Sequence, residues 1–361
     1  MNVTDKLYNE WAWRTKTGVP NINNPEDKAI LDNLLAELTE SQDPYSQLIS
    51  NIEKIKDDPD AVNYLNRYVN SRRFRAPFDE YISKQNIDSG TLQDVDAPDL
   101  VFNILSKNGD LENYMNNLDK LPGFGSLGTN GNLVNKLDNI VSKESATQLI
   151  NLGGQEGGRG VGKAEIGLAT LCTDVKMMKG EAGDLDWNGY LEVKGTGARL
   201  GKRDHAFSGG LKIIDLAQSN NIQDEKVGRT TLYNAPELLV QALIKAGVGK
   251  DVIANTLKQD LSPIYHSEAL SEFVNSSTVG NLEVALKQCY FSSYWKKEGV
   301  KHIIFVSTGG GNFGDYLSVN YEEGISYIKS NSKKFCSPIR FNQLAPQVFK
   351  SGVGVLSEDE E

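Results

Sequence analysis

The chain is poor in the residues that build disulfide frameworks and zinc sites. It has 3 cysteines and 3 histidines in 361 residues. Cys172, Cys289 and Cys336 are widely separated and form no Cys-x-x-Cys pair, so the sequence supports neither a disulfide framework nor a zinc knuckle. The histidines are equally scattered. We therefore expect a protein of the reducing cytoplasm.

Long hydrophobic runs are also missing. No stretch approaches the length of a membrane span, and the polar start MNVTD has the features of neither a signal peptide nor a transit peptide. We expect a protein that stays in the compartment where it is made and has no membrane partner. The charged and apolar fractions are typical of a globular protein, and the length allows two domains.

Positive charge is in deficit. The formal net charge is −10 and the sequence pI is about 5.0, which excludes a basic coat for tight, indiscriminate binding of nucleic acid. A local basic patch remains compatible with this balance. Arg199, Lys202 and Arg203 form such a patch in one loop, and they are candidates for contacts with a phosphate backbone.

The most informative segment is residues 183–194, GDLDWNGYLEVK, which predicts a β-hairpin with two facing acids. Residues 187–189 fit a three-residue loop, a type I turn closed by Gly189 in the left-handed region. This register places Asp184 opposite Glu192. Facing residues have Cβ atoms about 4.5–5.5 Å apart, so the two carboxylates can share one hard cation.

The alternation of polar and apolar residues favours this register over a two-residue Asn-Gly loop. A two-residue loop would set Glu192 against Leu185 and mix charged with apolar side chains on both faces. In the three-residue register one face is apolar and the other polar. The apolar face carries Leu185, Leu191 and Val193, and the polar face carries Asp184, Asp186, Tyr190, Glu192 and Lys194.

These residue types suit phosphodiester hydrolysis. Two facing carboxylates repel each other unless a cation lies between them. A metal ion held there would neutralise charge on a scissile phosphate and activate water, while the Lys194 ammonium orients the nucleophile or stabilises the pentacoordinate charge. The alternative is a solvated hairpin face with an incidental Glu-x-Lys pair. Because Lys194 is placed on the polar face, its loss is predicted to cost about half a kcal/mol.

Three segments together resemble the PD-(D/E)XK nuclease superfamily, which has the restriction-endonuclease-like fold. They are GVGKAEIGLATL at 160–171, GDL at 183–185 and EVK at 192–194. The order in that family is a helix with a glutamate, a strand with the aspartate and a strand with Glu-x-Lys. The resemblance implies that Asp184 and Glu192 bind Mg²⁺ or Mn²⁺, that Lys194 is the catalytic lysine, and that Glu165 binds a second metal or a water. The chain departs from the pattern in having no proline before Asp184.

The resemblance implies DNA as the substrate and a mixed sheet flanked by helices, an α/β or α+β core. The nucleic-acid contacts are then predicted at Arg199, Lys202 and Arg203, with Lys163 as a fourth candidate at the end of a Gly-rich loop. That loop, residues 153–162, either brings backbone N–H groups to a DNA phosphate just before a helix N-terminus or is a surface loop that only caps the helix.

Element patterns divide the chain into a helical N-terminal domain and this core. Residues 1–120 are predicted to be helical, with an N-cap at 24–27 and helices over 29–38, 45–55, 61–69 and 97–105. Residues 121–132 are a Gly-rich linker, the predicted boundary. Residues 133–345 form the nuclease-like domain, and residues 346–361 are an acidic tail.

Within residues 133–345, helical spacing predicts one helix over 133–150 and a helical insertion at about 220–280, with segments at 235–245, 251–257 and 267–274. A helix over 282–297 leads into a buried strand at 301–307, the closing α–β unit of the core. One further strand has two candidates, residues 211–215 and 316–321.

One other interpretation, nucleotide binding, competes with the nuclease. Residues 157–164, GGRGVGKA, nearly match the phosphate loop of nucleotide-binding proteins, but Ala164 lacks the hydroxyl that binds magnesium and no apolar strand precedes the loop. Arg72, Arg73 and Arg75, predicted at a helix end, could touch a phosphate backbone or form a solvated face. The glycines at 309–311 are interpreted as an ordinary turn.

The N-terminus carries a second, short resemblance. Residues 7–14, LYNEWAWR, followed by 17–20, TGVP, resemble the openings of structural or virion-associated proteins of large tailed phages. This implies a bacteriophage protein in the host cytoplasm or the virion, with other virion proteins as partners. The alternative function is a virion structural or assembly protein whose nuclease-like domain contacts DNA. The simpler interpretation is an amphipathic helix whose two tryptophans pack on the helical domain.

Overall fold

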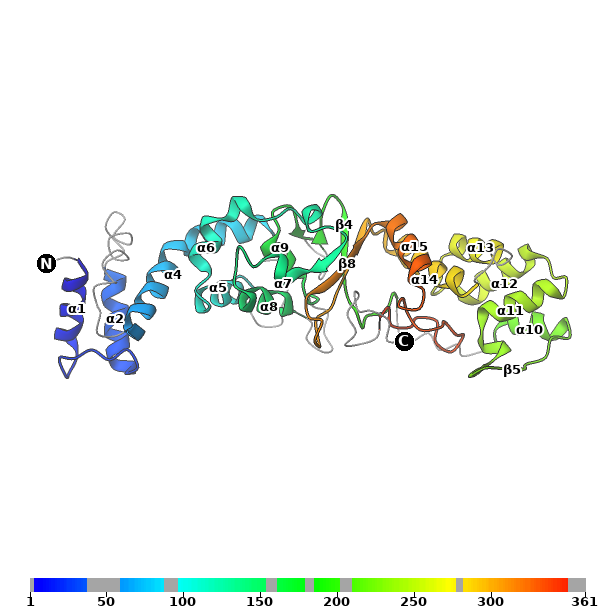
Figure 1. Cartoon of the computed structure of the whole chain (residues 1–361), viewed down its shortest axis with the longest axis horizontal. Helices are drawn as coiled ribbons and strands as arrows, with labels where there is room; N and C mark the ends of the chain where they lie inside the picture. Colours follow the sequence, from blue (N-terminus) through cyan, green and yellow to red (C-terminus); the bar gives the residue numbers. More distant parts are fainter. Residues whose placement is uncertain are drawn as a thin grey trace.

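The computed structural model describes residues 3–37, 59–87, 97–153, 161–178, 185–201, 210–276 and 282–349. Three predicted site residues, Asp184, Lys202 and Arg203, and the helix predicted over 45–55 lie outside these ranges. The fold is mixed α+β. Figure 1 shows an elongated molecule with α1 and α2 at one end, α10 to α13 at the other, and the sheet between them.

The main sheet has six strands in the order β1-β8-β7-β4-β3-β2. All neighbours are antiparallel except β4 and β7, which run parallel. The strands are β1 (Asn130–Asn132), β2 (Lys176–Met177), β3 (Leu185–Asp186), β4 (Tyr190–Gly195), β7 (His302–Val306) and β8 (Asp315–Val319). A separate two-stranded ribbon pairs β5 (Lys226–Val227) with β6 (Thr230–Thr231). Of the two candidates for a further strand, the one at 316–321 is confirmed as β8.

Both faces of the sheet are covered, because alternate side chains of the central strands enter two different cores. Val193 of β4 and Ile304 and Val306 of β7 belong to one core, together with the helices before the sheet. Ile303 and Phe305 of β7 belong to the other, together with the helices that lie between β4 and β7 in the chain. A strand in the middle of a sheet covered on both faces is buried on both sides.

The N-terminal helices form a third, smaller core. These helices are α1 (Val3–Arg14), α2 (Pro25–Glu37) and α4 (Pro59–Lys84). The predicted N-cap of α2 is confirmed, since Asn24 Oδ1 accepts the Glu26 N–H at 2.9 Å. Only one of the two tryptophans packs as predicted. Trp11 is buried and donates to the Asp27 carbonyl at 2.7 Å, whereas Trp13 is 83% exposed.

Helix α4 continues fifteen residues beyond the predicted end at 69, so the arginines at 72, 73 and 75 lie within the helix and not at its end. Pro77 lies inside it. Arg75 is paired with Asp79 at 2.9 Å and with Asp99 at 2.6 Å, and its guanidinium lies over the Phe102 ring. These contacts join α4 to α5 (Ala97–Lys107), whose predicted range is confirmed.

The prediction that residues 121–132 are only a Gly-rich linker between two domains is wrong. This segment forms a short 3-10 helix, Phe124–Leu127, and then β1, which pairs with β8. Phe124 and Leu127 are buried in the core that contains Phe78 from α4 and Leu133 from beyond the segment. Glycine content predicted a domain boundary, but the pairing partner of β1 comes from about 185 residues further along the chain.

The single helix predicted over 133–150 is two helices, α7 (Leu133–Lys136) and α8 (Lys143–Asn151). The chain breaks between them because the Ser142 side chain caps α8 by accepting the Ser145 N–H at 3.2 Å. Ile140 and Val141 in the break are buried. The short α6 (Leu111–Asn116) precedes this region.

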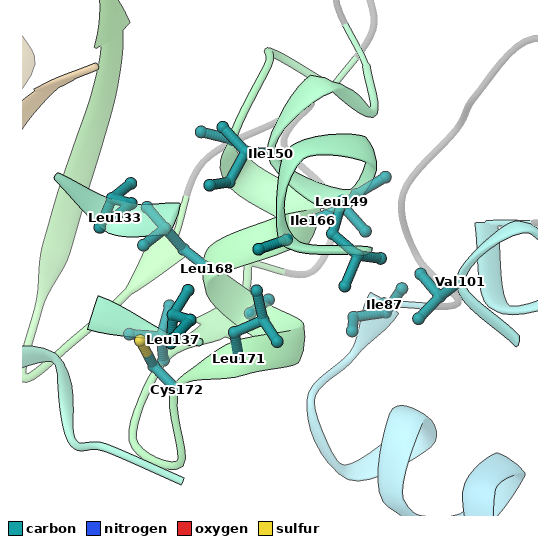
Figure 2. Close-up of a cluster of buried hydrophobic side chains, with 14 of the residues drawn as sticks. Ile87, Val101, Leu133, Leu137, Leu149, Ile150, Ile166, Leu168, Leu171 and Cys172 are labelled. Carbon is teal, nitrogen blue, oxygen red and sulfur yellow. The ribbon is translucent and has the colours of Figure 1, made fainter. Parts of the chain in front are cut away.

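Helix α9 (Glu165–Leu171) is buried along its whole length and carries the predicted helix acid. Figure 2 shows its Ile166, Leu168 and Leu171 among apolar side chains of the surrounding helices, with Leu149 and Ile150 of α8 beside them. Its backbone approaches α8 closely at Gly167. A Cβ at that position would lie 2.9 Å from the Leu149 carbonyl oxygen.

Gly167→Ala is therefore expected to lower the free energy of unfolding by about 2 kcal/mol, because backbone atoms of α8 would have to move. Gly210→Ala is the control, since a Cβ there meets nothing within 4 Å. Urea unfolding followed by circular dichroism measures both. Equal stability of the two variants would show that α8 and α9 are not packed this closely.

The remaining helices are α10 (Lys212–Ser219), α11 (Pro236–Lys245), α12 (Lys250–Leu261), α13 (Ser267–Ser276), α14 (Leu282–Glu298) and α15 (Tyr321–Ser330). The strand candidate at 211–215 is wrong, because these residues begin α10. The helices predicted between 235 and 297 and the strand predicted at 301–307 are confirmed. Among the described residues, no helix is long and apolar enough to cross a membrane.

The last described residues do not belong to an acidic tail. Val348 and Phe349 are buried, and their N–H groups donate to the Ala198 and Thr196 carbonyls at 2.8 and 2.9 Å. The predicted tail therefore cannot begin at residue 346. Its acidic part, residues 357–361, lies outside the described ranges.

Candidate active site

The predicted register of the hairpin is confirmed. Leu185 faces Leu191, and Asp186 faces Tyr190. Asp184 lies outside the described residues, so its own position is not described. A ladder continued by one pair would set it opposite Glu192, because antiparallel pairing advances one residue at a time on each strand.

The turn itself differs from the predicted type I turn. Gly189 has φ +120°, but Asn188 also has a positive φ, +54°, where a type I turn requires a negative one. Asn tolerates the left-handed region better than most residues, which allows this geometry. Asp186 Oδ1 accepts the Gly189 N–H at 3.0 Å and stabilises the turn.

An aromatic cluster fixes the tip of the hairpin on the sheet. The Trp187 ring packs against Phe124 and His302, with centroids 4.7 and 5.2 Å away. Asp174 joins the tip to the preceding chain, since its carboxylate accepts the Trp187 indole N–H at 2.9 Å and the Phe124 N–H at 2.7 Å. Burial lowers the pKa of the His302 imidazole. The strand that carries Glu192 is thus anchored at its start.

The centre of the polar face is buried, although Asp186 on the same face is exposed and Lys194 is partly exposed, so a fully solvated hairpin face is not what the structure has. Glu192 is only 3% exposed, and its neighbour on β7 is the buried Ile303. Helix α14 reaches this face at Tyr294, whose ring lies against the Lys194 ammonium and belongs to the same core as Ile303. A carboxylate in such a place is costly unless charge and hydrogen bonds compensate it.

Two side chains of the same strand provide that compensation. The Lys194 ammonium forms an ion pair with Glu192 Oε1, and the Tyr190 hydroxyl donates a hydrogen bond to Glu192 Oε2. Residues 190, 192 and 194 point to one face because side chains alternate along a strand. The result is a row of phenol, carboxylate and ammonium, with the acid in the middle.

Lys194 lies where the row meets solvent. Its side chain is 25% exposed, compared with 4% for the Glu192 side chain. The ammonium also lies over the Tyr294 ring of α14, 5.5 Å from the centroid, a cation–π contact. A charged group that is partly open to solvent and held by two partners can reach an anionic substrate without leaving its strand.

Glu165 is buried, and it is the first residue of α9. Its Oε2 accepts the Gly162 N–H at 2.8 Å. A Cβ at Gly162 would collide with the Glu165 carboxylate, so glycine leaves the room that this side chain occupies. Glu165 is therefore no solvated surface charge, and its participation in the site stays a prediction.

The predicted phosphate-binding residues have mixed surroundings. The Arg199 guanidinium donates to the Ala345 carbonyl, which fixes the loop after β4 to the chain near its last described residues. Lys163 is half-buried just before α9. Lys202 and Arg203 lie outside the described residues. Contact of these residues with nucleic acid stays a prediction.

The nucleotide-binding alternative is weakened by what precedes the loop. A phosphate loop connects a strand to a helix, whereas the described chain before residue 154 is helix α8. The residue before α9, Ala164, has φ +72° and no capping side chain. The glycines of the loop, 157–160, are outside the described residues.

No group of three or more His, Cys, Asp or Glu side chains placed to hold a metal occurs within the described ranges. Asp184 is not among those residues, so this finding leaves the predicted pair with Glu192 untested. The three cysteines are free and buried.

Sequence reasoning placed Tyr190 and Lys194 on the face of Glu192 but missed that Tyr190 is a direct partner. The signal was present, since residues at i and i+2 of one strand share a face. Tyr294 could not have been found this way, because it comes from a helix about 100 residues later.

Comparison with protein family models, with curated proteins and with solved structures finds no match to this chain. A function for the protein therefore has to be argued from its own residues.

Proposed function

We propose that this protein is a metal-dependent nuclease that hydrolyses phosphodiester bonds of DNA with Mg²⁺ or Mn²⁺. The observation that carries the proposal is the buried row on β4, in which a carboxylate is held between a hydroxyl and an ammonium. Buried ionisable groups that are held by specific partners cluster at functional sites.

The order of the elements supports this proposal. Helix α9 begins with Glu165, β3 begins directly after Asp184, and β4 carries Glu192 and Lys194. Helix α14 then leads to β7, which lies parallel to β4. This is the order that the resemblance to the PD-(D/E)XK superfamily implies, including the closing α–β unit.

The donor set fits a hard divalent cation, since the implied ligands Asp184, Glu192 and Glu165 offer only carboxylate oxygens. A bound Mg²⁺ or Mn²⁺ would neutralise charge on the scissile phosphate and lower the pKa of a bound water. Lys194 would direct its ammonium to that water or to the phosphate. Arg199, Lys202, Arg203 and Lys163 would hold the DNA backbone.

The deciding experiment incubates the purified full chain with supercoiled, linear and single-stranded DNA in Mg²⁺, Mn²⁺ or EDTA. We expect cleavage with either metal and none with EDTA. Glu192→Gln should reduce the rate at least about 100-fold, the scale seen when one charge-stabilising group is removed from an active site.

Glu144→Gln is the matched control. Glu144 is an exposed acid on α8 that accepts a hydrogen bond from the Gln148 amide at 3.2 Å, so its variant should cleave like the parent. Intact DNA under all conditions would refute the nuclease proposal and favour a protein that only contacts DNA. Parental cleavage by Glu192→Gln would instead show that Glu192 is not part of the active site.

A further inference from the structure

The tyrosine at the start of β4 has a defined relation to the candidate metal ligand. The Tyr190 hydroxyl donates to Oε2 of Glu192, while Lys194 is paired with Oε1. The two oxygens of one carboxylate therefore have different partners. One partner is a neutral phenol, and the other is a partly exposed cation.

The backbone and the ring of Tyr190 are both held in place. The residue is paired with Asp186 across the hairpin, and its carbonyl accepts the Lys301 N–H at 2.9 Å on the other side. Its half-buried ring packs against the core under α14. Because backbone and ring are held, the hydroxyl can define the orientation of the Glu192 carboxyl plane.

The Lys194 ammonium can be replaced as the partner of Glu192 Oε1. The lysine is six times more exposed than the acid, and its ammonium has the Tyr294 ring as a second partner. An incoming cation can replace the ammonium at Oε1, since both are positive and Lys194 can swing toward solvent. Replacing the Tyr190 hydroxyl at Oε2 would instead need a change inside the core.

We propose that Tyr190 is a positioning residue for Glu192: its hydroxyl fixes Oε2 and leaves Oε1 as the oxygen that binds the divalent cation in exchange for Lys194. This rests on the proposed function, and it adds which oxygen binds and what orients it. Side chains that hydrogen-bond a metal ligand commonly change metal affinity about 10- to 100-fold when they are removed.

The test measures Mn²⁺ binding without DNA by isothermal titration calorimetry. Tyr190→Phe keeps the ring and removes only the hydroxyl, and we expect it to weaken Mn²⁺ binding about 10-fold or more. Replacement of Tyr190 by 4-aminophenylalanine keeps a donor at the same place and should restore binding close to the parental value. A purely structural tyrosine would change stability and leave the affinity of the folded protein unchanged.

Tyr64→Phe is the matched control, because the Tyr64 hydroxyl also donates to a carboxylate, Asp32 Oδ1 at 2.9 Å, far along the chain from the site. It should bind Mn²⁺ like the parent. Glu192→Gln distinguishes failure of the positioning role from failure of the metal site. If the parent binds Mn²⁺ and Glu192→Gln does not, but Tyr190→Phe binds as tightly as the parent or more tightly, the positioning role alone is overturned. If the parent binds no Mn²⁺, or Glu192→Gln binds like the parent, both this inference and the metal site fail.

Discussion

Lys194→Ala is expected to lower the free energy of unfolding by about 3 kcal/mol. The substitution leaves the Glu192 carboxylate buried without its counter-charge, and removal of one partner of a buried ion pair typically costs about 3–5 kcal/mol. The lower end applies because Lys194 is a quarter exposed. This expectation replaces the half kcal/mol predicted from the hairpin pattern, because the structure pairs Lys194 with a buried acid. Urea unfolding at neutral pH measures the change.

A double-mutant cycle identifies the cause. Adding Glu192→Gln to Lys194→Ala removes the buried charge itself, so the double variant should be clearly more stable than Lys194→Ala alone. Lys176→Ala, an exposed lysine on β2, should change stability by no more than about half a kcal/mol. If Lys194→Ala behaves like Lys176→Ala, the ion pair contributes nothing in solution.

Lys194→Ala is also expected to slow DNA cleavage by about 100- to 1000-fold, the range for removal of a group that stabilises charge in a transition state. Its Mn²⁺ affinity should not fall, because the lysine is no metal ligand, and it should rise because the ammonium no longer competes with the cation for Glu192 Oε1. Asp184→Asn should instead weaken Mn²⁺ binding, so that more metal recovers part of the rate. Single-turnover rates over a range of Mn²⁺ concentrations separate these two patterns.

Both variants must be assayed where circular dichroism shows them folded, since the first is expected to be destabilised. Asp138→Asn serves as the control for the aspartate, because Asp138 is exposed between α7 and α8. If Lys194→Ala and Asp184→Asn degrade DNA at the parental rate in Mn²⁺, Lys194 and Asp184 have no catalytic role.

The sequence by itself determined the hairpin. The register Leu185 to Leu191 follows from polar and apolar alternation within ten residues, because a shift by one residue would bury charges and expose leucines. The helices between 235 and 297 were predictable because each has its own periodic apolar pattern, and the strand at 302–306 because it is a short continuous apolar run. The order of elements around Glu165, Glu192 and Lys194 also lies in the sequence.

The secondary structure of short or glycine-rich segments could not be predicted from the local sequence. Residues 211–215 are an apolar run that suits a strand or a helix, and the N–H groups of Lys212 and Ile213 find the Asp260 carboxylate, at 3.1 and 2.8 Å, only in the helix. Asn130–Asn132 has no strand pattern at all and becomes β1 because β8 offers free backbone groups at the edge of the sheet.

The character of the site was decided only by the tertiary structure. Alternation places Tyr190, Glu192 and Lys194 on one face of β4, but it cannot tell whether that face meets water or another layer. In the structure Glu192 is a buried acid, and Tyr294 of α14, about 100 residues later in the chain, lies over its partner Lys194. Burial then requires partners for both carboxylate oxygens, and the nearest groups on the strand, the Tyr190 hydroxyl and the Lys194 ammonium, meet that requirement.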